Sequence, residues 1–179
     1  MFEFQSAREA FALRDRVLKS ILPVAALDVL NPLASARCGG HKGWLLALRA
    51  VNAVERYSVE FPGGRDVDCE PFWARIQEFT PGYLEQRPNA VVTRYSTTHT
   101  AMPALMEACD GTAIARAGNG VVYNYDGKPV ASAKRVIEYA PPGIERWPSP
   151  GADLPLMQRV KQMFDPQGLL NPGALHGRI

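Results

Sequence analysis

Residues 91–127 decide the fold class of this chain and read VVTRYSTTHTAMPALMEACDGTAIARAGNGVVYNYDG. The stretch opens with a strand pattern, and a threonine follows it that can cap a helix reaching Cys109. Two more apolar runs, 112–117 and 121–125, have the length of strands, and Asp126-Gly127 is typical of a hairpin turn. The stretch therefore predicts a strand, a helix and then two further strands.

The same alternation runs through the rest of the chain. Ser6-x-x-Glu9 has the form of a capping box, and the segments 35–43 and 80–82 have the composition of a loop and a helix end. Strands are expected at 2–5, 26–30, 44–48 and 134–139, and helices at 7–21, 52–61, 71–79 and 154–164. This order predicts an α+β fold with ferredoxin-like units, in which helices cover an antiparallel or mixed sheet.

Composition favours a single globular domain over residues 1–179. Hydrophobic residues make up 46% of the chain and charged residues 21%, and the formal net charge is +2. This weak charge argues against a nucleic-acid partner. No apolar run approaches the ~20 residues of a membrane helix, and the first residues do not resemble a signal peptide. The sequence therefore predicts a cytoplasmic protein.

The three cysteines predict neither a disulfide framework nor a metal site. Cys38, Cys69 and Cys109 are odd in number and far apart. Cys38 and His41 are close enough in sequence to share a metal ion, but two ligands do not make a site. We therefore expect buried or half-buried thiols and no metal.

The last part of the chain carries the most specific pattern. A helix ends at Asp165-Pro166, the apolar pair Leu169-Leu170 follows, and Asn171-Pro172-Gly173 is a turn sequence. In physical terms this predicts two sharp reversals of the chain around a buried Leu169-Leu170 anchor.

As a pattern, residues 161–173 read K-x-x-F-D-P-x-G-x-L-N-P-G, which closely resembles the C-terminal signature of FAD-linked oxidases of the vanillyl-alcohol oxidase type. Other stretches are similar to the smaller FAD-linked subunit of bacterial glycolate oxidase, so that the resemblance covers nearly the whole chain. These stretches are 1–30, 92–96, 115–120 and Arg146-Trp147.

The resemblance implies the C-terminal substrate (cap) domain of such an oxidase. Members of the family bind FAD mainly through an N-terminal domain whose glycine-rich loops hold the pyrophosphate. Here Gly39-Gly40 and Gly63-Gly64 are isolated pairs without that context. The N-terminal FAD-binding domain is therefore expected to be absent, through truncation or because it is encoded separately. The histidine-rich motifs of the larger glycolate oxidase subunit are also missing.

Five residues are candidates for the functional site. Arg94 on a strand can bind a substrate carboxylate through two parallel hydrogen bonds, or form a structural ion pair. The resemblance places Asn119, Lys161, Asn171 and Gly173 near the flavin or the domain interface. The alternatives are a left-handed turn at Asn119, a solvated lysine at position 161 and purely turn-forming roles for the last two. No residue is predicted as the catalytic base.

The activity that the resemblance implies is oxidation of a small 2-hydroxy acid such as glycolate, with FAD as the cofactor of the intact protein. The isolated chain is expected to be inactive. The expected partners are the FAD-binding domain and other oxidase subunits, through which the protein would lie at the periphery of the inner membrane. An alternative is a non-catalytic module that binds other subunits of a glycolate oxidase complex.

Overall fold

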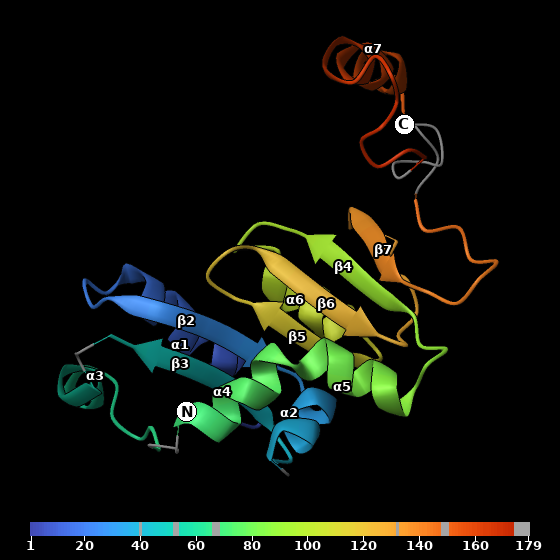
Figure 1. The fold of residues 1–179 in the computed structure, drawn as a ribbon. Helices are drawn as coiled ribbons and strands as arrows, with labels where there is room; N and C mark the ends of the chain where they lie inside the picture. The colour runs from blue at the N-terminus through green and yellow to red at the C-terminus, as the bar shows by residue number, and fades with distance from the viewer. Residues whose placement is uncertain (40, 52–53, 66–68, 132, 148–150, 174–179) are drawn as a thin grey trace.

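The computed structural model describes residues 1–39, 41–51, 54–65, 69–131, 133–147 and 151–173 (Figure 1). Seven antiparallel strands form one sheet in the order β1-β3-β2-β5-β6-β4-β7. The strands are β1 (Phe2–Phe4), β2 (Val24–Leu30), β3 (Trp44–Ala50), β4 (Val92–Ser96), β5 (Thr112–Arg116), β6 (Val121–Tyr125) and β7 (Arg135–Tyr139). The helices are α1 (Ala7–Lys19), α2 (Pro32–Gly39), α3 (Val54–Glu60), α4 (Cys69–Gln77), α5 (Phe79–Gln86), α6 (Met102–Ala108) and α7 (Leu154–Phe164). The predicted α+β class is confirmed, and the sheet is antiparallel rather than mixed.

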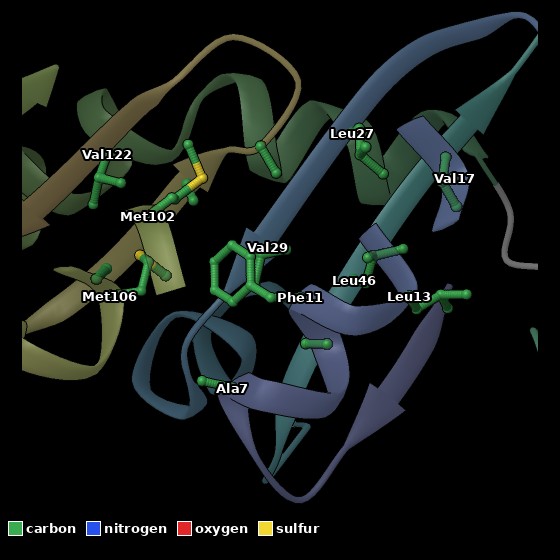
Figure 2. Close-up of a cluster of buried hydrophobic side chains, with 14 of the residues drawn as sticks. Ala7, Phe11, Leu13, Val17, Leu27, Val29, Leu46, Met102, Met106 and Val122 are labelled. Atoms are coloured by element: carbon green, nitrogen blue, oxygen red, sulfur yellow. The ribbon is translucent and has the colours of Figure 1, made fainter. Parts of the chain in front are cut away.

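One face of the sheet is covered by α1 and α6. Ser6 begins α1 with the predicted capping box, because its hydroxyl accepts the Glu9 N–H and its own N–H donates to the Glu9 carboxylate. Figure 2 shows Phe11 of α1 beside Val29 of β2, and Met102 of α6 toward Val122 of β6 in the same cluster. Burial of this apolar face is the main force that holds the two helices in place.

The opposite face is covered by α2, α4 and α5 (Figure 1). Its core contains Leu45 and Ile114 from the strands and Ile76 and Phe79 from the helices. Neighbouring residues of β3 therefore enter different cores, which explains why the run 44–48 is apolar on both faces, as its sequence predicts.

Two helices occur where the sequence predicts a loop or a helix end. Residues 35–39 belong to α2, whose first turn is stabilised by the Asn31 side chain, since Asn31 Oδ1 accepts the Ala34 N–H at 3.0 Å. Pro81-Gly82 lies within α5 and not after a helix. A proline in the first turn of a helix costs little, because the N–H groups there have no helical acceptor.

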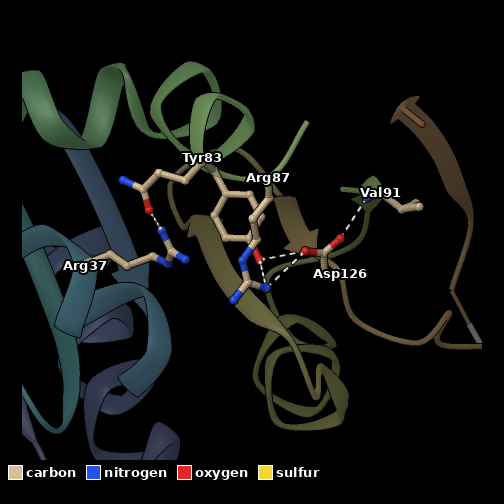
Figure 3. A network of polar contacts seen from close by, with 6 residues as sticks. Arg37, Tyr83, Arg87, Val91 and Asp126 are labelled. Carbon is tan, nitrogen blue, oxygen red and sulfur yellow. Dashed lines mark hydrogen bonds and ion pairs between the residues drawn. The ribbon is translucent and has the colours of Figure 1, made fainter. Parts of the chain in front are cut away.

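The predicted hairpin at Asp126-Gly127 is wrong. After β6 the chain crosses to β7, which pairs with β4 on the far side. Asp126 has a left-handed backbone (φ 56°), as such a turn requires, but its carboxylate accepts hydrogen bonds from the Val91 N–H at 2.9 Å and the Tyr83 hydroxyl at 3.0 Å (Figure 3). These hydrogen bonds tie the turn to Val91 and to α5, and the chain then crosses over β4 instead of forming a hairpin with β6.

The molecule has two regions of different character. We call the described residues of 1–147 the sheet body and residues 151–173 the tail unit. In Figure 1 the tail unit stands away from the sheet, and none of the α7 side chains is buried.

Candidate functional site

A polar strip crosses one face of the sheet body. β-ladder pairs align Arg94 of β4 with Tyr123 of β6, and Arg116 of β5 with Asp28 of β2. Since side chains two residues apart share a face, these four lie on the same side as the core residue Ile114. Arg94, Arg116 and Tyr123 are only partly buried, so this part of the face is accessible.

Arg94 forms an ion pair within the strip. Its Nε lies 2.5 Å from Oε1 of Glu138 on β7, and the side chain is about one-third exposed. The structural ion pair considered from the sequence is therefore present, with an acid on a neighbouring strand. The two terminal nitrogens of Arg94 make no polar contact with the described residues, so they could still bind a carboxylate.

Asp28 and Arg116 form a second and more deeply buried pair. Oδ2 of Asp28 lies 3.0 Å from a terminal nitrogen of Arg116, whose other terminal nitrogen donates to the Ile76 carbonyl at 3.4 Å. Burial raises the pKa of Asp28, and the Arg116 charge partly offsets that increase. Sequence reasoning missed both residues. Both lie inside stretches that carry the resemblance, Asp28 within 1–30 and Arg116 within 115–120.

Asn119 belongs to the turn between β5 and β6 and is exposed. The left-handed residue in this turn is Gly120 (φ 78°) and not Asn119, so the alternative of a left-handed Asn119 is wrong. A Cβ at Gly120 would lie 2.5 Å from the Thr97 carbonyl oxygen, which explains the glycine. Asn119, Gly118, Arg116 and Asp28 line one hollow of about 440 Å³.

A buried arginine holds the base of this turn. Arg14 of α1 is 1% exposed and donates to the carbonyls of His99 at 2.9 Å and Ala117 at 3.4 Å. Its Nε lies 2.6 Å from the Asp15 carboxylate. Arg14 therefore connects α1 to the residue that precedes the turn, which keeps Asn119 beside the polar strip.

Lys161, Asn171 and Gly173 belong to the tail unit, whereas Arg94 and Asn119 belong to the sheet body. Figure 1 shows α7 of the tail unit standing away from β4 and β6. Lys161 is not simply solvated, because its Nζ lies 2.6 Å from Oδ2 of Asp165 and also contacts the Leu170 carbonyl. Asn171 (φ 44°) and Gly173 (φ 71°) both have left-handed backbones, as the predicted turn requires.

Asp165 organises the tail unit. Its two carboxylate oxygens accept the N–H groups of Leu169 and Leu170, each at 2.9 Å. The hydrogen bond from Lys161 is the main reason why the pKa of Asp165 falls to about 2, and the two backbone N–H groups also contribute. Asp165, the aspartate of the signature, therefore holds the loop that follows α7 in its bent conformation.

The predicted burial of Leu169 and Leu170 is wrong for this chain. Leu169 is 72% exposed and Leu170 62%, while their backbone N–H groups are bound by Asp165. Large apolar side chains of α7 are also exposed, namely Leu156, Met157, Val160, Met163 and Phe164. An apolar surface of this kind marks a site where another surface packs.

Cys38 and Cys109 are buried free thiols. Burial raises the pKa of Cys38 and of Cys109 to about 11, so neither is a thiolate nucleophile at neutral pH.

Among the described residues, no three His, Cys, Asp or Glu side chains gather as metal ligands. No helix in the same part of the chain is long and apolar enough to cross a bilayer.

The described residues offer no cradle for a dinucleotide pyrophosphate. Gly63-Gly64 follows α3 instead of joining a strand to a helix, and Gly64 packs against the Phe2 ring.

Comparison with known protein families gives a match in the last part of the chain. Residues 149–175 match the model of FAD linked oxidases, C-terminal domain. No curated protein matches the chain. The match covers the tail unit, stops short of the sheet body and supports an FAD-linked oxidase C-terminal domain. It implies FAD as the cofactor of the intact protein and an FAD-binding domain as the partner, and it does not distinguish between substrates.

Proposed function

We propose that this chain is the substrate-side domain of an FAD-dependent oxidoreductase that acts on a small 2-hydroxy acid of the glycolate type. The observation that carries the proposal is the tail unit, which matches the oxidase model and exposes an apolar surface for a partner. In the intact protein this partner would be the FAD-binding domain. FAD supplies the acceptor for the hydride of the substrate.

The residues of the polar strip suit the recognition of an acid substrate. Arg94 and Arg116 lie on the same sheet face, and each retains N–H donors beyond its contact with a carboxylate of the chain. An arginine fork binds a carboxylate with two parallel hydrogen bonds and so fixes the orientation of the substrate. We assign Arg94 to this role, with Arg116 two strands away on the same face, and we assign Asn119 to the contact with the flavin.

The flavin contacts in the tail unit are proposed to be of a different kind. Lys161 is held by Asp165 and is therefore placed to support the loop, while Asn171 and Gly173 shape the backbone that meets the flavin domain. This arrangement makes the three residues part of the interface more than of the substrate pocket.

A second candidate is a non-catalytic module that binds other subunits of a glycolate oxidase complex. The ion pairs of Arg94 and Arg116 favour this alternative, because each arginine already has a carboxylate partner. In both cases we propose a cytoplasmic protein that reaches the inner membrane only through its partners.

The distinguishing experiment uses the protein that contains both this chain and the FAD-binding domain. Arg94→Lys should raise the KM for glycolate by about tenfold or more, because lysine cannot form the two parallel hydrogen bonds. The flavin absorption spectrum should not change. Arg8→Lys, an exposed position on α1, is the matched control. Equal kinetics of Arg94→Lys and the control would favour the non-catalytic module.

A further inference from the structure

We infer that a cavity at the outer edge of β3 binds a small monocarboxylic acid with an aromatic body. This cavity, which we call the Tyr57 cavity, has a volume of about 220 Å³ and lies between α3, α4 and the end of β1. Four buried rings line it, those of Tyr57, Phe61, Phe72 and Trp73. The inference does not depend on the proposed function.

The cavity exists because β1 is shorter than its neighbour. β1 pairs with β3 only at residues 44–46, so on this edge residues 47–50 have no ladder partner among the described residues. The chain returns past this edge through the turn after α3. Gly63 (φ 91°) permits the turn, and a Cβ at Gly64 would lie 2.7 Å from the Phe2 ring. The walls are therefore aromatic while one side stays open.

The Tyr57 hydroxyl is the first sign of a ligand. Tyr57 is only 5% exposed, and its hydroxyl has no hydrogen-bond partner in the part of the chain that the structure describes. A buried hydroxyl without a partner is costly, and proteins almost always satisfy such a group. An acceptor oxygen on a bound molecule would satisfy it.

Two arginines indicate the charge of that molecule. Arg49 and Arg65 both line the cavity. Arg49 pairs with Glu70 at 3.6 Å, and that carboxylate is strongly exposed to water, so the pair is weak. Arg65 makes no side-chain polar contact with any described residue. Among the described residues that line the cavity, two are arginines and none is acidic, while Glu70 pairs with Arg49 and Glu60 lies near enough to raise the pKa of Tyr57. An apolar interior with two lining arginines favours an anion with an apolar body.

The volume limits the size of the ligand. A cavity of about 150 Å³ lined by apolar side chains can hold benzene. At about 220 Å³ the Tyr57 cavity has space for one aromatic ring and a short carboxylate arm, but not for a dinucleotide or a flavin. Flat aromatic ligands also suit the four surrounding rings, because offset stacking adds to the free energy of burial.

The test measures binding to the whole chain by calorimetry and by NMR chemical shifts. The probe is phenylacetate. The matched controls are phenylacetamide, which lacks the negative charge, and acetate, which lacks the aromatic ring. Phenylacetate should bind saturably and shift the Trp73 indole signal, while each control should bind at least about tenfold more weakly. Arg65→Gln should weaken phenylacetate binding by about tenfold, and Tyr57→Phe by about threefold to tenfold.

Arg159→Gln, on the exposed surface of α7, should bind phenylacetate like the wild type. Tyr57→Phe removes only the unpaired hydroxyl, so this variant should fold, which circular dichroism checks. The inference is wrong if phenylacetate does not saturate below about 10 mM. It is also wrong if the amide binds as tightly as the acid, or if the shifted signals lie outside the cavity. None of these results bears on the oxidase proposal, which concerns the polar strip and the tail unit.

Discussion

Leu46 on β3 is fully buried between the sheet and α1, whereas Met163 on α7 is 70% exposed. Both are large apolar residues on regular elements, so their different burial reflects what each region packs against. The sheet body buries its apolar side chains in two cores of its own. The tail unit is held together by polar contacts around Asp165 and leaves its large apolar side chains exposed. The first region therefore stabilises itself, and we propose that the second packs against a partner.

Core substitutions should show the largest difference between the regions. Leu46→Ala removes buried apolar volume and should lower the free energy of unfolding by about 2–5 kcal/mol. Met163→Ala should change it by less than about 0.5 kcal/mol in the same chain, because the side chain is already exposed. Chemical denaturation followed by circular dichroism measures both. Equal losses would mean that α7 packs on the sheet body.

The turn beside the polar strip offers a comparison between adjacent residues. Gly120→Ala should destabilise the protein by about 2 kcal/mol, because it places a Cβ at positive φ and against the Thr97 carbonyl. Asn119→Ala is exposed and should change stability by less than about 0.5 kcal/mol. Melting temperatures of the two variants test this order. A larger effect at Asn119 would contradict the backbone assignment.

The pKa values of two carboxylates should be shifted in opposite directions from the ordinary value. The folded pKa of Asp28 is raised, so between the unfolded value of 3.8 and that folded pKa the native state binds more protons. In this window its contribution makes the free energy of unfolding fall as pH rises. The folded pKa of Asp165 is about 2, so its contribution is present above 3.8 and is lost as pH falls toward 2. Carboxyl ¹³C NMR titration measures both, and Asp28→Asn and Asp165→Asn assign the signals. Similar midpoints would be inconsistent with the different surroundings of the two groups.

The smallest effect is expected from loosening the tail unit. Asp165→Asn removes the charge that holds Lys161 and weakens the bonds to two backbone N–H groups. Amide hydrogen exchange at Leu169 and Leu170 should become faster, while exchange in β3 stays the same. Gln167→Asn, at an exposed position of the same loop, is the control. Unchanged exchange at both leucines would show that Asp165 does not organise the loop.

Local sequence signals predicted much of the fold. The capping box at Ser6 and the Asp-Pro end of α7 act within a few residues, so their outcome could be read without knowing the tertiary structure. The hairpin predicted at Asp126-Gly127 is wrong because a turn sequence does not determine which strand the next strand pairs with. The partner of β7 is β4, some forty residues earlier in the chain, and only the pairing of distant strands decides this.

The candidate site was predicted less completely. Arg94 lies on a strand, as its sequence pattern predicts, and is partly exposed, while Asn119 is exposed in the turn between β5 and β6. Their roles in binding stay predictions. The buried pair of Asp28 and Arg116 could not be found, because its members are 88 residues apart and meet only through the β2–β5 ladder. The exposure of Leu169 and Leu170 was also missed, since an apolar pair indicates burial but not whether this chain or another surface provides it.

The central claim is that the tail unit docks on a flavin-binding domain. Hydrogen–deuterium exchange of this chain, alone and with that domain added, tests the claim directly. We predict that added flavin domain protects the amides of α7 and of residues 165–173, and that Met163→Ser together with Phe164→Ser abolishes this protection. Protection confined to the sheet body, with α7 exchanging as fast as in the isolated chain, would contradict the claim.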